Sequence, residues 1–299
     1  MYVNRSILSL NKGYKMEYNT ISGMFYHVVN KFPNNELYYY KKDDNWIGLN
    51  GSVIAQTVED ICFGIKAFNP EPFNAAIMSN NSPRWAMTDY GIVCSGGVTV
   101  SVYPTLIASQ VSYILQDSGA KLIFVENREQ KEKVLEIIDN CPELEKIIVM
   151  DDSNNEKDDR IINFMDFLNM GSEFSNETDL TFKGLVDDVN ENDLMTLIYT
   201  SGTTGNPKGV MLTHKNLISN INSVGDNIEF SNEDVFLSFL PLSHVFERMG
   251  GHFTAFSRGG KTYYSEGIEK VADNMGEVKP TVMLSVPRLY EKMYTKILQ

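Results

Sequence analysis

Apolar positions along the chain recur with two different spacings, which predicts alternating helices and strands. Near the start, residues 21–29 and 53–65 carry apolar side chains at helical spacing and predict two helices. Between them, aromatic and aliphatic runs at 37–40 and 46–49 flank the charged stretch 41–45. Two such runs around a polar turn are typical of a β-hairpin.

Short apolar runs then alternate with helix-length segments. The predicted strands of this series are 75–78, 98–102, 122–125 and 147–150. Ser82 and Pro83 have the pattern of a helix N-cap and first helical residue, and Gly119 that of the glycine that ends the helix at 110–117. Strands that alternate with helices predict a parallel sheet covered on both faces.

Two polar stretches, 151–160 and 187–193, interrupt the alternation. We interpret the first as a solvated surface loop rather than an acidic site, because charge runs usually only face water. The alternation then resumes, and each new apolar run is expected to precede a helix. These runs are 194–199, 235–240, 262–264 and 282–284.

The chain is therefore predicted to be an α/β protein of layered βαβ units, with mostly parallel sheets covered by helices. One βαβ series covers about 20–170 and a second about 190–299, and the two show no self-similarity that would indicate a repeat.

Charge and cysteine content exclude several classes of protein. The net charge of -13 disfavours nucleic acid as a partner, since such binding depends on Lys and Arg. Cys62, Cys94 and Cys141 lie far apart, without the spacing of a zinc site, and fit a reducing compartment. The segment 91–104 is too short to span a bilayer, and residues 1–15 lack the apolar stretch of a signal sequence. We expect a cytoplasmic protein.

A turn rich in glycine and hydroxyl groups follows the predicted strand 194–199 and ends at Lys208. Glycines let backbone N–H groups approach an anion, hydroxyls add neutral donors, and lysine adds a compact positive charge. The turn is therefore predicted to bind the phosphates of a nucleotide. The expected nucleotide contacts are Thr200, Ser201, Gly202, Thr203, Thr204, Gly205, Lys208 and Gly209.

This turn is not a Walker A loop. Counted from Gly202, the second glycine of that motif falls on Pro207, and Lys208 is followed by Gly209 instead of Ser or Thr. The other alternative is a Ser/Thr/Gly linker without chemistry. The position of the turn, between a strand and a lysine, favours phosphate binding.

The segment 199–209 resembles the signature of the adenylate-forming, or AMP-binding, superfamily, which contains acyl-CoA synthetases, luciferases and peptide-synthetase adenylation domains. Further segments are similar to the long-chain acyl-CoA synthetase branch, so the resemblance runs from about residue 20 to the last residue. These segments are 81–85, 96–105, 113–118, 240–248 and 280–290.

The resemblance implies a long-chain fatty-acid–CoA ligase that uses ATP, Mg²⁺ and coenzyme A. A fatty acid would become an acyl adenylate and then an acyl-CoA thioester. Lys208 would offset charge on the leaving pyrophosphate, and His244 would orient the carboxylate; these are the two expected catalytic residues. A hydroxyl of Thr203 or Thr204 would reach the metal, and we assign Thr204.

Other polar residues have simpler interpretations. His27, His214 and His252 are read as structural. Glu247 and Arg248 fit the family pattern but equally a charge pair on a helix surface. The run 250–256 is read as core packing rather than the lining of an acyl channel.

The family pattern extends beyond residue 299, with a Tyr-Gly-x-Thr-Glu segment, a ribose-binding aspartate, a hinge and a small C-terminal domain. We therefore expect 1–299 to be part of an N-terminal AMP-binding domain, without the C-terminal domain and with little ligase activity alone. Expected partners are fatty acid, ATP and CoA, and the family leaves open a homodimer and peripheral membrane association. The alternatives are adenylation of another carboxylic acid for a carrier protein, and a non-catalytic nucleotide- or acyl-binding module.

Overall fold

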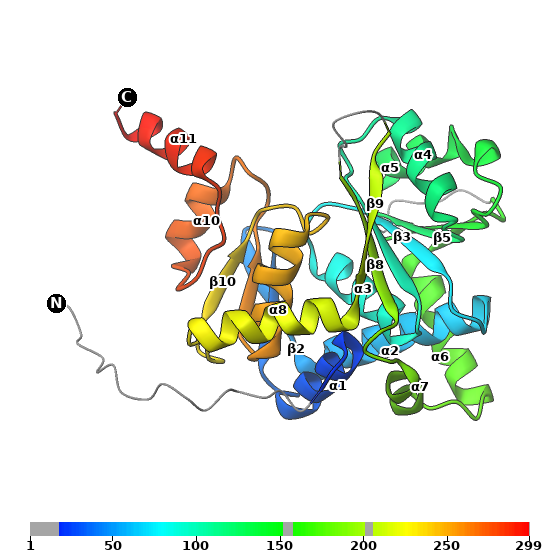
Figure 1. The fold of residues 1–299 in the computed structure, drawn as a ribbon. Coiled ribbons are helices and arrows are strands. Elements are labelled where there is room, and N and C mark those ends of the chain that lie inside the picture. The colour runs from blue at the N-terminus through cyan, green and yellow to red at the C-terminus, as the bar shows by residue number, and fades with distance from the viewer. Residues whose placement is uncertain (1–17, 152–157, 201–205, 299) are drawn as a thin grey trace.

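Two β-sheets organise the chain in a computed structural model that describes residues 18–151, 158–200 and 206–298 (Figure 1). The larger sheet has seven strands in the order β7-β6-β5-β3-β4-β8-β9, and the smaller has four in the order β10-β11-β1-β2. The strands are β1 (Glu36–Lys42), β2 (Asn45–Asn50), β3 (Asn74–Met78), β4 (Val98–Val102), β5 (Leu122–Val125), β6 (Lys146–Val149), β7 (Ile161–Asn163), β8 (Leu194–Thr200), β9 (Lys208–Thr213), β10 (Val235–Ser238) and β11 (Lys261–Tyr264).

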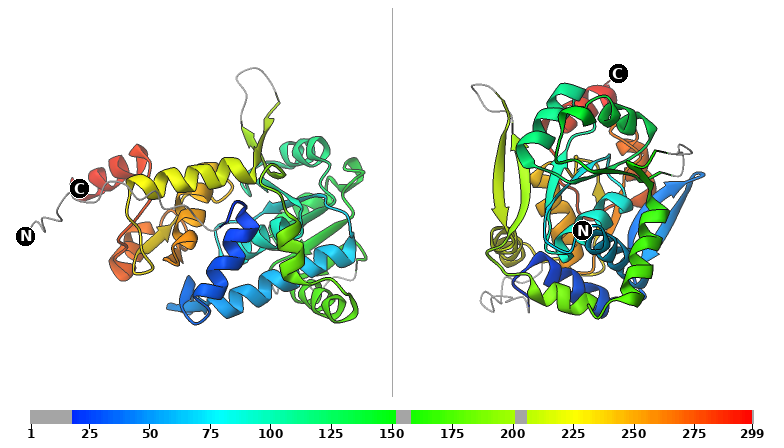
Figure 2. Two further views of the ribbon diagram at one scale, coloured as in Figure 1. Left: turned by 60° about the horizontal axis from the view of Figure 1, so that its bottom comes forward. Right: turned by 90° about the vertical axis from the view of Figure 1, so that its right-hand side faces the viewer.

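Helices cover the sheets, as Figures 1 and 2 show. They are α1 (Ile21–Lys31), α2 (Gly51–Phe68), α3 (Pro83–Cys94), α4 (Ala108–Ser118), α5 (Arg128–Leu135), the short η1 (Ile138–Asn140), α6 (Phe164–Glu177), α7 (Phe182–Asp188), α8 (His214–Asn227), η2 (Glu247–Phe253), α9 (Thr254–Ser257), α10 (Val271–Val278) and α11 (Pro287–Leu298). The predicted α/β class with mostly parallel sheets is confirmed.

The predicted helix boundaries are confirmed where capping residues marked them. Ser82 caps α3 by accepting a hydrogen bond from the backbone N–H of Trp85 at 3.1 Å, and Pro83 is the first helical residue. Gly119 ends α4 with φ of 60°, a left-handed conformation that favours glycine.

Two predictions about the second series were wrong. The strand β8 is followed not by a helix but by β9, which returns antiparallel to it from Thr200↔Lys208 to Leu194↔Thr213. The helix α8 begins only after β9, where Thr213 supplies the cap. The run 282–284 forms no strand, only one bridge, because Thr281 and Val282 both donate to the single carbonyl of Val235 before the chain turns toward α11.

The sheets do not follow the boundary between the two βαβ series. β8 and β9 extend the seven-stranded sheet beyond β4, and the early hairpin β1–β2 completes the four-stranded sheet beside β11. Consequently the carboxyl ends of strands from both series meet in one region. Among the described residues, no helix combines the length and apolar character that a bilayer span requires.

The two faces of the seven-stranded sheet cover different interiors. On one face, α4 and α5 pack over an aliphatic layer that includes Val100, Leu115 and Ile123. On the other face, α1, α2, α3 and α6 enclose a larger layer that is rich in aromatic residues and continues to the four-stranded sheet. Side chains alternate between the layers along each strand, as β geometry requires.

Candidate functional site

A cleft of about 580 Å³ lies where the carboxyl ends of strands from both sheets meet. In the seven-stranded sheet, β4 and β5 lie on opposite sides of β3, and such a switch point is where open α/β sheets bind ligands. The cleft is lined by Tyr40, Lys41, Ser79, Asn80, Asn81, Ser82, Tyr103, Pro104, Thr105, Glu126, Phe239, Leu240, Pro241, Tyr264, Ser265, Glu266, Gly267 and Ile268.

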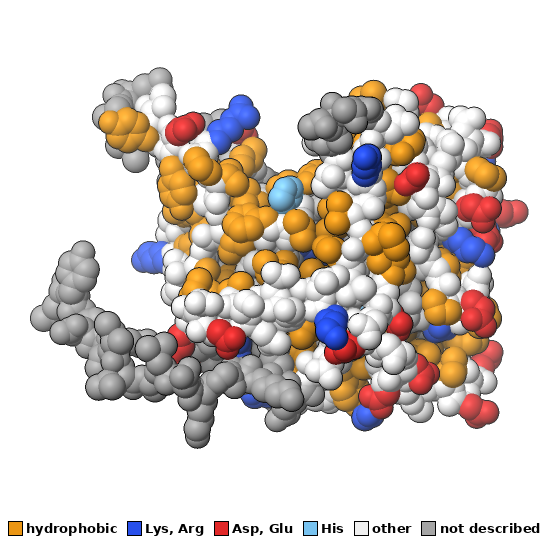
Figure 3. All heavy atoms as spheres, in the orientation of Figure 1, with side chains coloured by type: hydrophobic (Ala, Val, Ile, Leu, Met, Phe, Trp, Pro, Cys, Tyr) orange, Lys and Arg blue, Asp and Glu red, His pale blue; other side chains and the backbone are white. Residues whose placement is uncertain are grey.

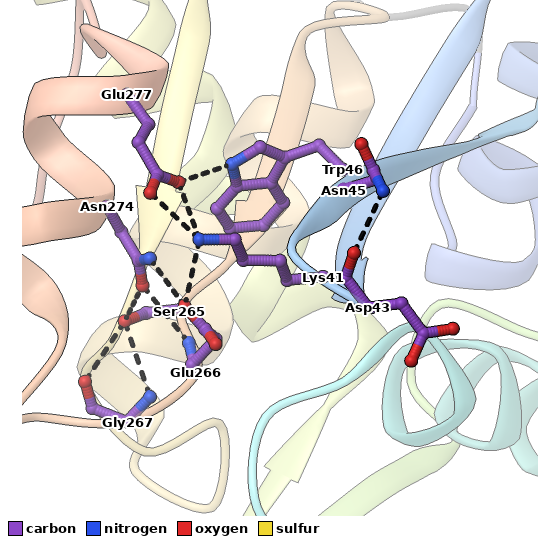
Figure 4. A network of polar contacts seen from close by, with 9 residues as sticks. All are labelled: Lys41, Asp43, Asn45, Trp46, Ser265, Glu266, Gly267, Asn274 and Glu277. Carbon is purple, nitrogen blue, oxygen red and sulfur yellow. Dashed lines mark hydrogen bonds and ion pairs between the residues drawn. The ribbon is translucent and has the colours of Figure 1, made fainter.

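One wall of this cleft is held by the polar network drawn in Figure 4. Lys41 Nζ lies 2.8 Å from Glu277 Oε1 and 3.5 Å from Glu266 Oε2, and Trp46 Nε1 donates to Glu277 at 2.9 Å. Asn274 also donates to Glu266, so the network ties α10 to the β1–β2 hairpin. Because Lys41 forms ion pairs with Glu266 and Glu277, its positive charge is neutralised by residues of the same wall.

The segment 239–246, which we call the His244 segment, leaves β10 and is fixed by Asn81. The Asn81 amide donates to the Leu240 carbonyl at 2.7 Å and to Ser238 Oγ at 3.0 Å. Its oxygen accepts from the Leu242 N–H at 2.8 Å. A side chain at the carboxyl end of β3 thus holds a loop of the other sheet.

A second anchor joins the His244 segment to β4. Ser101 Oγ donates to the Ser243 carbonyl at 3.1 Å, and Ser243 Oγ donates to the Val102 carbonyl at 3.2 Å. The sequence segments 81–85, 96–105 and 240–248, which lie far apart along the chain, therefore meet at one place.

His244 is exposed, and its ring is oriented by the backbone. Its Nδ1 accepts a hydrogen bond from the Phe246 N–H at 3.1 Å. A neutral imidazole that accepts at Nδ1 carries its proton at Nε2. His244 consequently presents an N–H donor that is suited to a carboxylate or phosphate oxygen.

Glu247 and Arg248 are buried and do not pair with each other, so their interpretation as a surface charge pair was wrong. Arg248 Nε donates to Asp89 Oδ2 at 2.8 Å, and its other nitrogens donate to Asp89 Oδ1 and, at 2.6 Å, to Thr196 Oγ1. Thr99 also donates to Asp89. These contacts satisfy the charges of a buried ion pair and link α3, β4, β8 and η2.

Sequence reasoning missed Asp89, although a signal was available. Asp89 is the sole charged residue between Trp85 and Cys94 in an otherwise apolar helix. A lone carboxylate in such a helix indicates a buried partner, because an unpaired charge in the interior is very costly. The role of Asn81 had no comparable signal.

The predicted phosphate-binding turn joins β8 to β9. Thr200 and Lys208 are both exposed and face each other across the first paired position of this hairpin. Gly209 lies against the Tyr199 ring, where a Cβ atom would come within 3.1 Å of it. The Tyr199 hydroxyl donates to Asp117 of α4 at 2.6 Å. Ser201, Gly202, Thr203, Thr204 and Gly205 lie outside the described residues.

The segments that carry the two expected catalytic residues lie at the carboxyl ends of two neighbouring strands, β8 and β4. β8 pairs in parallel with β4, so the hairpin that carries Lys208 leaves beside the strand to which Ser243 anchors the His244 segment. Among the described residues, no group of three or more His, Cys, Asp and Glu side chains is arranged to hold a metal ion. The assignment of Mg²⁺ to Thr204 remains a prediction.

The remaining histidines occupy structural positions. His214 is buried at the start of α8, where its Nδ1 accepts from the Ile21 N–H at 3.1 Å, and burial lowers its pKa to about 4. His252 lies in the core, and the ring of His27, a residue of α1, lies 5.5 Å from the ring of Tyr18. Phe253 and Phe256 are fully buried, which confirms core packing for these members of 250–256.

The three cysteines are buried free thiols. Burial raises the pKa of each, most strongly for Cys62 and Cys94, so they remain protonated. None takes part in the cleft or its anchors.

Fold and site together define a protein built like the N-terminal domain of adenylate-forming ligases. The family model for AMP-binding enzymes matches residues 29–298, and the chain belongs to this family. It is similar in structure to the anthranilate CoA ligase AuaEII in complex with anthranoyl-AMP, with a TM-score of 0.78 and 20% identity, covering 92% of this chain and 51% of that one.

Relatives by sequence carry the name long-chain-fatty-acid–CoA ligase. The chain is 30% identical over 286 residues to ACSBG2 of Xenopus laevis and 28% identical over 286 residues to ACSBG1 of Homo sapiens. Each alignment covers 93% of this chain. The chain spans 38% of the first relative's length and 39% of the second's.

Proposed function

We propose that the protein containing this chain is an acid–thiol ligase that activates a long-chain fatty acid with ATP and transfers the acyl group to coenzyme A. Membership of the AMP-binding family and the named relatives support this reaction. The observation that supports the proposal is that the Lys208 hairpin and the anchored His244 segment lie at the carboxyl ends of the neighbouring strands β8 and β4.

In the first step, a carboxylate oxygen attacks the α-phosphorus of ATP and the bond to pyrophosphate breaks. Negative charge moves onto the leaving pyrophosphate, so catalysis requires positioned donors and cations. Lys208 is an exposed cation at the mouth of the hairpin and can contact these oxygens. Mg²⁺ would enter with ATP as part of the substrate.

His244 would position the acid for this attack. Its Nε2–H can donate to one carboxylate oxygen and leave the other to attack, because Nδ1 is already engaged by the backbone of Phe246. In the second step the CoA thiol, after losing its proton, attacks the acyl carbonyl, and AMP leaves. The His244 segment would therefore act by orienting the carboxylate of the substrate.

Apolar surface beside the polar motifs suits a fatty acyl chain. Phe246, two residues after His244, is 43% exposed, and Met211, three residues after Lys208, is 67% exposed. Figure 3 shows hydrophobic side chains gathered across the middle of the face that is viewed in Figure 1, whereas acidic side chains concentrate toward the α5 and α6 side. A long hydrocarbon chain could cover part of this apolar surface.

The test uses the full-length enzyme with Lys208→Ala. The matched control is Lys215→Ala, which removes an exposed lysine of α8 that pairs with Glu191. Pyrophosphate release that depends on fatty acid should fall about 100-fold or more in Lys208→Ala. The apparent affinity for fatty acid should change little, and the control should retain its rate.

Three outcomes would overturn the proposal. Equal rates in wild type and Lys208→Ala would show that Lys208 does not act on the phosphates of ATP. Exchange that depends on amino acids instead of fatty acids would favour loading of a carrier protein. Binding of nucleotide without turnover in the full-length protein would favour a non-catalytic module.

A further inference from the structure

Arg248 is a charged side chain in the interior that connects the elements of the candidate site. It lies in η2 and is 2% exposed. Its backbone N–H donates to the His244 carbonyl at 3.1 Å, so Arg248 stands one helical turn beyond His244. From there its side chain reaches α3 and β8.

The guanidinium belongs to a closed ring of hydrogen bonds, which we call the Arg248 network. The Asp89 carboxylate on α3 accepts from Arg248 Nε at 2.8 Å and from one terminal nitrogen. Thr196 Oγ1 on β8 accepts from the other terminal nitrogen at 2.6 Å. Thr99 on β4 closes the ring, because its hydroxyl donates to Asp89 at 2.7 Å and its carbonyl accepts from Thr196 Oγ1 at 2.6 Å.

The surroundings of the Arg248 network hold the guanidinium in one place. Its central carbon lies 5.6 Å from the centre of the Trp85 ring and 5.6 Å from that of Phe253. Asp89, Thr99 and Thr196 are fully buried. Because the planar fork of arginine donates in fixed directions, the network sets the orientation of η2 as well as its distance from β8.

Both ends of the Arg248 network lead into segments of the proposed site. His244 lies four residues before Arg248. Thr200, where the predicted phosphate-binding turn begins, lies four residues after Thr196 on the same strand. Thr99 and Thr196 are also strand partners, so the network is built on the pairing of β4 with β8.

Stability alone does not explain why this position carries a charge. A buried ion pair loses through desolvation much of what it gains by attraction, and apolar residues of similar volume often give equal stability. Trp85, Met195 and Phe253 already contact Arg248 with apolar or weakly polar groups. An apolar side chain could fill this space, but it could not make directed hydrogen bonds from η2 to α3 and β8.

We propose that Asp89 and Arg248 are positioning residues, which hold the His244 segment at a fixed distance and angle from the strand that carries the phosphate-binding turn. This inference rests on the proposed function. A carboxylate must approach the α-phosphorus in line with the leaving pyrophosphate, and a misplacement of about 1 Å can cost about 100-fold in rate. Because both side chains are buried, they act through His244 and not on the substrate.

The first test is the double variant Asp89→Leu with Arg248→Met in the full-length enzyme, which removes both charges and keeps the space filled. The single-turnover rate of pyrophosphate release that depends on fatty acid should fall about tenfold or more. The ATP concentration that gives half of this rate should change less than about threefold, because the nucleotide contacts are retained. A stable double variant with the rate of wild type would overturn the inference.

The matched control is Val134→Ala on α5, a fully buried change in the other interior layer. It should lower the stability of the enzyme and keep the rate of pyrophosphate release. A loss of rate in Val134→Ala equal to that of the double variant would show that any loss of core stability slows the reaction, and would also overturn the positioning role.

Variants of Thr196 give a second test that leaves the ion pair in place, should the double variant not fold. Serine retains the hydroxyl that accepts from Arg248, whereas valine retains the volume without the hydroxyl. Thr196→Val should slow pyrophosphate release about threefold or more, and Thr196→Ser should restore most of the rate. Equal rates in the two variants would count against the Arg248 network.

A double-mutant cycle separates this inference from the proposed function. If the Arg248 network acts through His244, Thr196→Val should cost little further rate once His244→Ala has been introduced. Losses that multiply independently would contradict positioning through His244 and leave the proposed function intact. A wild-type enzyme that releases no pyrophosphate in response to fatty acid would overturn the proposed function itself, and this inference with it.

Discussion

The two interior layers of this molecule are stabilised by different physics. The layer under α4 and α5 is aliphatic, with members such as Val100, Leu115 and Ile123 that need only close packing. The layer between α3 and the four-stranded sheet contains a buried ion pair, neutral acids and bases, and stacked aromatic rings. The first layer holds the sheet together, whereas the second connects the two sheets and supports the candidate site.

The largest effect should come from the ion pair in the polar layer. Asp89→Ala leaves the Arg248 charge buried without its partner, which should cost about 3–5 kcal/mol of unfolding free energy. Urea denaturation would measure the loss. The double variant Asp89→Leu with Arg248→Met removes both charges and should recover most of the stability. No recovery would show that the unpaired Arg248 charge is not the cause of the loss.

A smaller loss is expected in the aliphatic layer. Leu115→Ala removes a side chain that is 1% exposed and should cost about 3 kcal/mol, through lost burial and the cavity that remains. Because no titratable group is involved, this loss should be the same at pH 6 and pH 8. Dependence on pH would contradict the contrast between the layers.

The smallest effect concerns pH. His214 and His252 have pKa values lowered by burial from 6.5 to about 4 and 3, so their contribution to stability is present above pH 6.5 and is lost as the pH falls below it. The contribution of Glu247 to stability changes with pH in the opposite direction. Burial raises its pKa from 4.5 to about 8, so stability is lost as the pH rises from 4.5 to 8.

These groups together should give maximal stability near pH 6.5, with a loss of about 2 kcal/mol by pH 8 that is due to Glu247. Glu247→Gln should abolish that loss and keep the loss of stability at acid pH that His214 and His252 cause. Urea denaturation from pH 5 to 8.5 would check both. An unchanged alkaline slope in the variant would show that Glu247 is already ionised in the native protein.

The contrast also explains how much could be predicted from the sequence. The strands 75–78 and 98–102, the cap at Ser82 and the terminator Gly119 follow from local patterns, and all are confirmed. The strand β9 was missed because a glycine-rich turn after a strand usually leads to a helix, and nothing local marks its return to β8.

Polar contacts between distant segments were harder to predict than apolar ones. Asn81 and Ser101 hold the His244 segment through backbone atoms, and a backbone partner has no signature in the sequence. For Glu247 and Arg248, the sequence did not decide between a family role and a surface charge pair, because charge alone does not reveal whether a side chain is buried. Resemblance to the family identified Lys208 and His244, and their roles stay predictions.

The order in which strands enter the four-stranded sheet bears on how the protein is made. The β1–β2 hairpin emerges early from the ribosome, but its parallel neighbour β11 is synthesised after the whole seven-stranded sheet, since Tyr38 pairs with Thr262. The hairpin must therefore wait with one edge unpaired, a state that is prone to association with other nascent chains. Until β11 has been synthesised, we expect chaperones to bind this unpaired edge of the hairpin.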